Sequence, residues 1–259
     1  MKSSAITRII IWSLVAVILT GVLAWGLLAR GFFGFSLPLF RSSSKGGSYG
    51  AGSFAAAEVD EVHVEWISGK VTIQEGANIS FEEHSNRSLD EDEQLCYRLS
   101  GRTLYIEYTT RHYWFGNAPS KDLELTLPGQ LSKLKLELVS ADVSMDGDFV
   151  IDEVDVETVS GRIGINQLSS RDIAMETVSG KMELTIGTVP EEIDLDSVSG
   201  SMTLYWPTNA GFTAELESVS GDVESDFATT SRNGKIMYDD GHTKIDGNSV
   251  SGDLIIRQQ

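Results

Sequence analysis

A nine-residue phrase recurs along this chain, and its spacing limits the folds that the chain can adopt. Between residues 137 and 217 the copies follow one another about every twenty residues, and a last copy comes 31 residues later. Repeats of this length are typical of solenoids, in which each repeat packs only against its neighbours. The copies are EWISGKVTI at 65, ELVSADVSM at 137, ETVSGRIGI at 157, ETVSGKMEL at 176, DSVSGSMTL at 196, ESVSGDVES at 217 and NSVSGDLII at 248.

Within each repeat, apolar and polar residues alternate, which predicts β-strands rather than helices. In one repeat Val154, Val156 and Thr158 share one face of the expected strand. Asp155 and Glu157 share the opposite face. The chain is therefore predicted to be all-β.

The alternation changes phase at the centre of the phrase. After Thr158 the apolar set becomes Val159, Ile163 and Ile165. A straight strand would turn this second half inside out, so we expect the chain to bend there. Glycine allows the positive φ that such a corner often needs, and a serine hydroxyl can bond the backbone of the turn. The expected corner residues are Ser68, Gly69, Ser160, Gly161, Ser179, Gly180, Ser199, Gly200, Ser220, Gly221, Ser251 and Gly252, with Ser140 and Ala141 in the second phrase.

Stacking such bent units predicts a parallel β-solenoid (β-helix) of about 20-residue coils. Residues 74–130 are less regular and are expected to cap the N-terminal end of the stack. Asn233-Gly234 is a strong two-residue hairpin signal. The segment around it is interpreted as an excursion or a C-terminal cap.

The N-terminal region has a different character. Residues 9–29 contain no charge and are long enough to cross a bilayer as a helix. We interpret them as an uncleaved signal anchor with a cytoplasmic tail at 1–8, and a cleaved leader is the alternative. Residues 30–57 are expected to be an interfacial segment and flexible linker, and residues 58–259 the solenoid domain. The predicted location is the cell membrane, single-pass, with the C-terminal domain outside the cytoplasm.

Charge is distributed very unevenly. Residues 1–57 hold five of the 20 Lys and Arg and none of the 38 Asp and Glu, so the remainder carries 15 − 38 = −23. Such a domain repels nucleic acid and attracts cations or basic polypeptides. Cys96 is the single cysteine, so no intramolecular disulfide forms.

The acidic residue at the head of the phrase occupies the same position in successive coils. In-register coils would place these carboxylates about 4.8 Å apart along a column. The ordinary interpretation is a solvated face, with Arg162 and Lys181 pairing across the corner with Glu157 and Glu176. The sharper hypothesis is a face that binds a cationic peptide or divalent cations, with Ca²⁺ a weak candidate. The column comprises Glu137, Glu157, Glu176, Asp196 and Glu217, and a second, mostly acidic column comprises Lys135, Asp155, Ala174, Asp194 and Glu215.

The sequence offers little for catalysis. The corner serines recur in every coil without a recurring histidine, so they lack the neighbouring base that a nucleophile needs. No nonapeptide calcium repeat and no EF-hand loop is present. The histidines are scattered and lack metal-site spacing; they are His63, His84, His112 and His242.

The order of these motifs resembles the bacterial putative-adhesin family, domain of unknown function 4097. The motifs are V-x-V-x-x-I-S-G-x-V-x-I, then D-L-E-L-T-L-P-G, then serial V-S-G coils and a final G-H-T-K-I-D-G-N-S-V-S-G-D-L-I-I. The resemblance covers residues 58–259 and implies a β-solenoid ectodomain. Ala141 departs from the V-S-G pattern, which predicts a strained or differently shaped corner there. The family supplies no catalytic residues.

The expected function is a non-catalytic, adhesin-like binding or structural module of the bacterial envelope. An accessory protein in envelope-stress sensing, acting on a membrane partner, is the first alternative. A carbohydrate-active β-helix enzyme is the less favoured one. The expected partners are the membrane and either another envelope or membrane protein or a cationic peptide, with no nucleic acid and no cofactor.

Overall fold

The computed structural model describes residues 47–109, 119–232 and 234–259. The expected anchor at 9–29 lies outside these residues. In the described part the regular structure is β, apart from two short 3-10 helices, η2 (Ala56–Glu58) and η3 (Glu91–Glu93). None of the described helices combines the length and the apolar character needed to span a bilayer.

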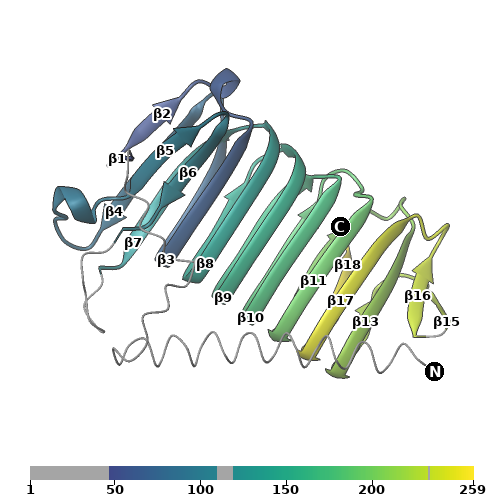
Figure 1. Cartoon of the computed structure of the whole chain (residues 1–259). Coiled ribbons are helices and arrows are strands. Elements are labelled where there is room, and N and C mark those ends of the chain that lie inside the picture. The colour runs from purple at the N-terminus through teal and green to yellow at the C-terminus, as the bar shows by residue number, and fades with distance from the viewer. Residues whose placement is uncertain (1–46, 110–118, 233) are drawn as a thin grey trace.

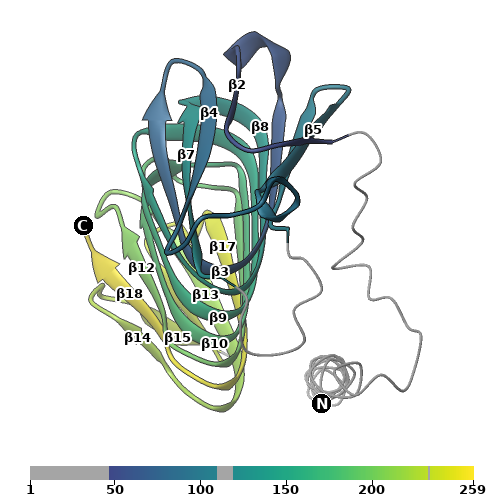
Figure 2. The ribbon, with the colours of Figure 1, turned by 90° about the vertical axis from the view of Figure 1, so that its left-hand side faces the viewer.

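The chain winds into V-shaped coils that nest along one axis (Figure 2). Each coil has a first limb before the Ser-Gly corner and a second limb after it. Four strands run continuously through the corner, whereas three later coils are divided into two strands. The continuous strands are β3 (Glu61–Gly76), β8 (Gln130–Asp146), β9 (Phe149–Ser169) and β10 (Asp172–Ile186), and the divided coils are β11 (Glu192–Ser199) with β12 (Met202–Trp206), β13 (Phe212–Ser220) with β14 (Val223–Ser225), and β17 (Thr243–Ser251) with β18 (Leu254–Gln258).

Parallel pairing joins the coils into two sheets, one from each set of limbs. The first-limb sheet runs β6 (Thr103–Glu107), β3, β8, β9, β10, β11, β17, β13. The second-limb sheet runs β7 (Lys121–Pro128), β3, β8, β9, β10, β12, β18, β14. The predicted all-β, parallel architecture is confirmed.

The coils do not stack in the order in which they follow one another along the chain. The repeat alone would have suggested that order. The C-terminal coil β17–β18 lies between β11–β12 and β13–β14, as the yellow strand among the green ones in Figure 1 shows. The reason is the hairpin of β15 (Thr230–Arg232) and β16 (Lys235–Tyr238). Its second strand pairs antiparallel with the outer edge of β13, so the following segment returns along the inner edge. The predicted hairpin and C-terminal cap are both present.

Antiparallel strands cap the other end, as expected for residues 74–130. They are β4 (Ile79–Ser85) and β5 (Cys96–Ser100), and β1 (Ser48–Tyr49) and β2 (Gly52–Phe54) pair with them. The flexible linker expected up to residue 57 is therefore wrong for residues 48–54. The physical reason is aromatic packing: the Phe54 ring lies 6.3 Å from Phe81 and 6.0 Å from Tyr97.

The core lies between the two sheets, and the predicted alternation holds with one correction. Val154, Val156 and Ile163 are buried. Val159, expected to face inward, is 39% exposed, and its equivalent Val219 is 70% exposed. The change of phase therefore occurs within the corner, because the inward side chain before it is Thr158 and the next is Ile163.

The corner glycines are required by contact between coils more than by backbone conformation. φ is in the left-handed region at Gly161 and Gly180 but not at Gly200. A Cβ on Gly180 would lie 2.1 Å from the carbonyl oxygen of Gly161, and one on Gly200 would lie 2.0 Å from that of Gly180. These glycine corners thus rest directly on the backbone of the neighbouring coil, and no side chain fits at them.

Ala141 makes the expected different corner. Its φ is not positive, its side chain is buried, and the β8–β9 ladder has no pairs between Leu138–Thr158 and Val143–Ile163. The serine hydroxyls here do bond the turn, since Ser140 Oγ donates to the Ile67 carbonyl at 3.2 Å and Ser160 Oγ to Val139 at 3.4 Å.

Just before the corner, a stripe of hydroxyl side chains faces the core. Thr158 Oγ1 donates to the Ser160 carbonyl at 3.1 Å. The next four hydroxyls of the stripe are buried and form no hydrogen bond with a described protein atom. They belong to Thr177, Ser197, Ser249 and Ser218, which are neighbours in the stack.

Candidate cation-binding face

The outer surface of the first-limb sheet carries the predicted column of acidic residues, here called the acidic row. The parallel register places Glu137, Glu157, Glu176 and Asp196 on adjacent strands, as predicted. The predicted contact of Asp196 with Glu217 is wrong, because the inserted C-terminal coil puts Asn248 between them. In stack order the complete row is Glu107, Glu65, Glu137, Glu157, Glu176, Asp196, Asn248 and Glu217.

A second row lies two residues earlier on the same strands. It contains the predicted column, with His63 added before Lys135 and Asp246 inserted between Asp194 and Glu215. At the C-terminal end of this face, carboxylates therefore occupy both rows on β11 and β13 but only the second row on β17. In stack order the second row is Tyr105, His63, Lys135, Asp155, Ala174, Asp194, Asp246 and Glu215.

Lys135 neutralises much of the charge at the centre of the face. Its Nζ lies 3.1 Å from Glu137, 3.2 Å from Asp155 and 2.7 Å from Glu157. Although partial burial disfavours its charge, the hydrogen bonds to these three carboxylates raise the pKa of Lys135 above its ordinary value.

The expected pairing of Arg162 and Lys181 with the acidic row is wrong. Lys181 pairs with Glu183 instead, and the backbone N–H of Arg162 donates to Asp142 Oδ1 at 2.7 Å. Both residues come after the corner, so their side chains project from the second-limb sheet, whereas Glu157 and Glu176 project from the first.

Farther along, the side-chain carboxylate of Glu176 forms no hydrogen bond or ion pair with a described residue. Desolvation above the sheet raises its pKa, and the carboxylates of Asp196 and Glu157 on either side raise it further. Like charges directly opposite on neighbouring strands destabilise a sheet. Glu176 is therefore a position where an external cation would lower the free energy of the face.

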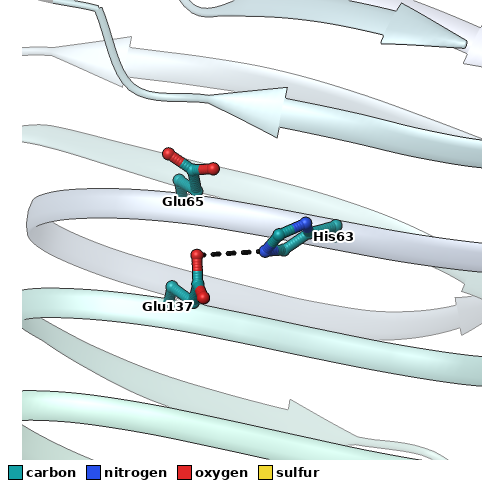
Figure 3. Close-up of side chains that lie close together, drawn as sticks. All are labelled: His63, Glu65 and Glu137. Atoms are coloured by element: carbon teal, nitrogen blue, oxygen red, sulfur yellow. Dashed lines mark hydrogen bonds and ion pairs between the residues drawn. The ribbon is translucent and has the colours of Figure 1, made fainter. Parts of the chain in front are cut away.

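At the N-terminal end of the row, the side chains of His63, Glu65 and Glu137 lie close together, as Figure 3 shows. His63 and Glu65 are two residues apart on one face of β3, and Glu137 is directly opposite Glu65 on β8. His63 Nε2 lies 3.1 Å from Glu137 Oε2, and one ligand atom of each residue lies within 4.8 Å of the others. Because the histidines are far apart in the sequence, their spacing did not predict this cluster. Alignment of the first phrase with the second would have indicated it.

The two carboxyls of this cluster have opposite pKa shifts. The hydrogen bond from His63 lowers the pKa of Glu137 to about 2, against the effect of burial and together with Lys135. Burial raises the pKa of Glu65 to about 7, and the charges of Glu107 and Glu137 contribute to the rise. The negative charge of Glu137 is thus balanced by neighbouring positive groups, whereas that of Glu65 is not.

A second group of possible metal ligands, Glu192, Asp194 and Asp246, lies on β11 and β17. Lys244 pairs with both Glu192 and Asp246. Lys244 thus pairs with two of the three ligands of this group, whereas in the cluster around Glu65 the cation Lys135 pairs with Glu137 alone of the three.

The model of one protein family, Toastrack DUF4097, matches residues 122–257, just over half of the chain. The matched region contains the serial V-S-G coils and the inserted C-terminal coil. The chain belongs to the Toastrack DUF4097 family. Among curated proteins, nothing matches this Toastrack chain.

Solved structures resemble this Toastrack chain. A putative cell adhesion protein from Clostridium sporogenes ATCC 15579 has 14% identity and a TM-score of 0.53, and the alignment covers 82% of this chain and all of that one. A putative adhesin from Bacteroides fragilis NCTC 9343 has 11% identity and a TM-score of 0.45, covering 81% of this chain and 96% of that one. At 14% identity, the likeness to the Clostridium sporogenes protein supports the fold alone.

The corner residues of this Toastrack domain lie together along one edge of the V, where successive serines and glycines are stacked in register. The serine hydroxyls at Ser140 and Ser160 bond backbone carbonyls, and the glycines contact backbone. These residues therefore shape the coil, and the chemistry of the surface belongs to the acidic row and its His63 end.

Proposed function

We propose that this protein is a membrane-anchored, extracytoplasmic binding module of the bacterial envelope, without catalytic activity, and that its acidic row contacts a cationic partner. The observation that carries the proposal is the run from Glu176 to Glu217. Neither of these two carboxylates forms an ion pair with a described basic side chain, and the parallel sheet holds them in fixed register.

The charge of the domain favours a basic polypeptide as the partner. Residues 58–259 carry −23, which opposes nucleic acid and anionic lipid headgroups. A row of carboxylates on adjacent strands presents the periodic negative charge that an extended basic segment can match. Carboxylates repeated evenly along a sheet differ from the local acid–base pair that glycoside hydrolysis needs, which supports a non-catalytic role.

Binding of a labelled decalysine peptide tests the proposal. The full chain in detergent micelles would be titrated at low and moderate salt, and fluorescence anisotropy would be measured. The variant Glu157→Gln, Glu176→Gln, Glu217→Gln should bind at least about tenfold more weakly than wild type, because three charges of the row are removed.

A matched control removes three charges elsewhere. Glu82→Gln, Glu183→Gln, Glu224→Gln has the same net charge but changes the second-limb sheet and its cap, and it should bind the peptide within about twofold of wild type. Equal weakening of both variants would show that net charge alone attracts the peptide and would reject the acidic row as the contact surface.

The proposed topology has its own test. The uncharged stretch at 9–29 is proposed to hold the domain outside the cytoplasmic membrane. An epitope tag fused after Gln259 should be removed by protease added to intact protoplasts. A tag that survives until the membrane is lysed would contradict this orientation.

A further inference from the structure

We propose that His63, Glu65 and Glu137 form a binding site for a single divalent transition-metal ion of the Zn²⁺ class. This site goes beyond the proposed function, because it needs His63 from the second row, lies away from the run from Glu176 to Glu217, and does not depend on a cationic partner. It also differs in chemistry from a calcium site on the acidic row.

The donor set points to a transition metal. One imidazole nitrogen with two carboxylate oxygens is a combination that Zn²⁺ and its neighbours accept, with water in the remaining position. Ca²⁺ instead takes six to eight oxygen ligands, which three side chains on a flat sheet do not supply. The histidine is therefore the residue that selects the class of ion.

The backbone already places the three donors for chelation (Figure 3). His63 and Glu65 project from the same face of β3, and the direct register of Glu65 with Glu137 brings the third side chain alongside. His63 Nε2 and Glu137 Oε2 are 3.1 Å apart. Two ligands of one tetrahedral Zn²⁺, each 2.0–2.1 Å from the ion, are about 3.3 Å apart. A ligand atom of Glu65 lies within 4.8 Å of the other two, so the Glu65 carboxylate has to move closer to complete the set.

The carboxylate of Glu65 has no basic partner in the described part of the chain, so a cation bound at this position would be stabilised. Its carboxylate is half-buried and lies between Glu107 and Glu137 in the acidic row. The two nearby basic side chains are directed elsewhere: Lys135 contacts the other oxygen of Glu137 at 3.1 Å, and Arg98 lies 3.8 Å from Glu107. Among the described residues, none forms an ion pair or hydrogen bond with the side-chain carboxylate of Glu65.

Neighbouring aromatic and cationic groups limit how the site can rearrange. The His63 ring packs against Tyr105 with the ring centres 5.4 Å apart, and the Arg98 guanidinium lies 3.6 Å above that tyrosine ring. These contacts keep the imidazole over the sheet. Lys135 holds Glu137 from the opposite side, so its second oxygen remains directed at His63. The site is thus supported on both sides by contacts outside the donor set.

The full chain in detergent, stripped with EDTA, would be titrated with Co²⁺ and then Zn²⁺. We expect one equivalent of Co²⁺ to give the visible absorption of a site with a nitrogen ligand, and Zn²⁺ to displace it, while Ca²⁺ does not. His63→Gln should weaken binding at least about tenfold. The matched control is His84→Gln, which removes another histidine near a carboxylate, 3.6 Å from Glu124, and should leave binding unchanged.

A second readout separates loss of metal from loss of fold. Zn²⁺ should raise the thermal unfolding midpoint of wild type and His84→Gln but not of His63→Gln or Glu65→Gln. Glu65→Gln removes one of three adjacent negative charges and should fold at least as stably as wild type without metal. Absence of saturable Co²⁺ or Zn²⁺ binding to wild type would overturn the proposal. So would equal affinity in His63→Gln and His84→Gln.

Discussion

Asn248 Nδ2 donates a hydrogen bond to Asp196 Oδ1 at 2.8 Å, although 52 residues separate them in the chain. This contact exists because the C-terminal coil inserts between two earlier coils. At the inserted position the acidic row has an amide instead of a carboxylate. The amide donates to one neighbouring carboxylate and separates it from Glu217, where direct succession of the coils would have placed two like charges together.

Replacing this amide by an acid should destabilise the fold. Asn248→Asp removes the donor and places a third carboxylate between Asp196 and Glu217. We expect the free energy of unfolding to fall by about 1–2 kcal/mol at pH 7 and low salt. Urea denaturation measures it, and Asn248→Ala, which loses the bond without adding charge, is the control. The like-charge explanation requires Asn248→Asp to be the less stable of the two.

The corner glycines and the strand glycine Gly164 should respond oppositely to alanine. Gly180→Ala brings a Cβ against the backbone of Gly161, and we expect it to cost about 2 kcal/mol or more. At Gly164 the nearest neighbour of an added Cβ is the Val143 carbonyl oxygen at 3.7 Å. Gly164→Ala should be neutral or stabilise by up to about 1 kcal/mol. Chemical denaturation of both variants would contradict this account if their costs were equal.

Glu176 should make the fold less stable as pH rises. Its folded-state pKa is raised by desolvation and by Asp196 and Glu157, so the folded state holds this proton to higher pH than the unfolded state. The free energy of unfolding therefore decreases as pH rises above the ordinary glutamate pKa of about 4.3. Glu176→Gln should be more stable than wild type at pH 7, with the difference shrinking at about pH 3.5.

The control for that prediction is Glu153→Gln on the same sheet. Glu153 is paired with Lys133, so neutralising it should give no gain at pH 7. Thermal melts of both variants at the two pH values provide the comparison. A pH-independent gain in Glu176→Gln would indicate packing rather than charge.

Removal of a hydroxyl from the buried stripe should change stability differently for hydrogen-bonded and unbonded side chains. Ser197 is 2% exposed and its hydroxyl has no described protein partner, so Ser197→Ala should be neutral or stabilise by up to about 1 kcal/mol. Thr158 Oγ1 donates to Ser160, so the similarly shaped Thr158→Val should cost about 1 kcal/mol. A clear loss of stability in Ser197→Ala would show that its hydroxyl has a partner in solution.

Most of the structure of each coil could be predicted from the local sequence pattern, whereas the order of the coils in the stack could not. Alternation at Val154 and Val156 and the Ser-Gly phrase predicted strands, corner and inward face. All phrases fit one another about equally well, so nothing local distinguishes sequential stacking from insertion of β17. That choice depends on β16 pairing with β13, a contact between whole segments.

The candidate site shows the same division. Glu137, Glu157 and Glu176 occupy consecutive coils, so their adjacency could be predicted from the repeat. His63 and Glu137 are 74 residues apart because the N-terminal capping segment separates their coils in the chain. Spacing along the sequence does not indicate this cluster, whereas alignment of the first phrase with the second places Glu65 opposite Glu137 and His63 opposite Lys135.

The inserted C-terminal coil makes this fold depend on complete synthesis. A solenoid stacked in chain order could add its rungs as they leave the ribosome or the export channel, and a shortened chain would still be a shorter stack. Here a chain that stops before residue 243 leaves β11–β12 and β13–β14 with facing edges unpaired. Such edges are sites of aggregation and proteolysis. The arrangement therefore acts as a length check, in which only chains that include the C-terminal coil form a closed stack.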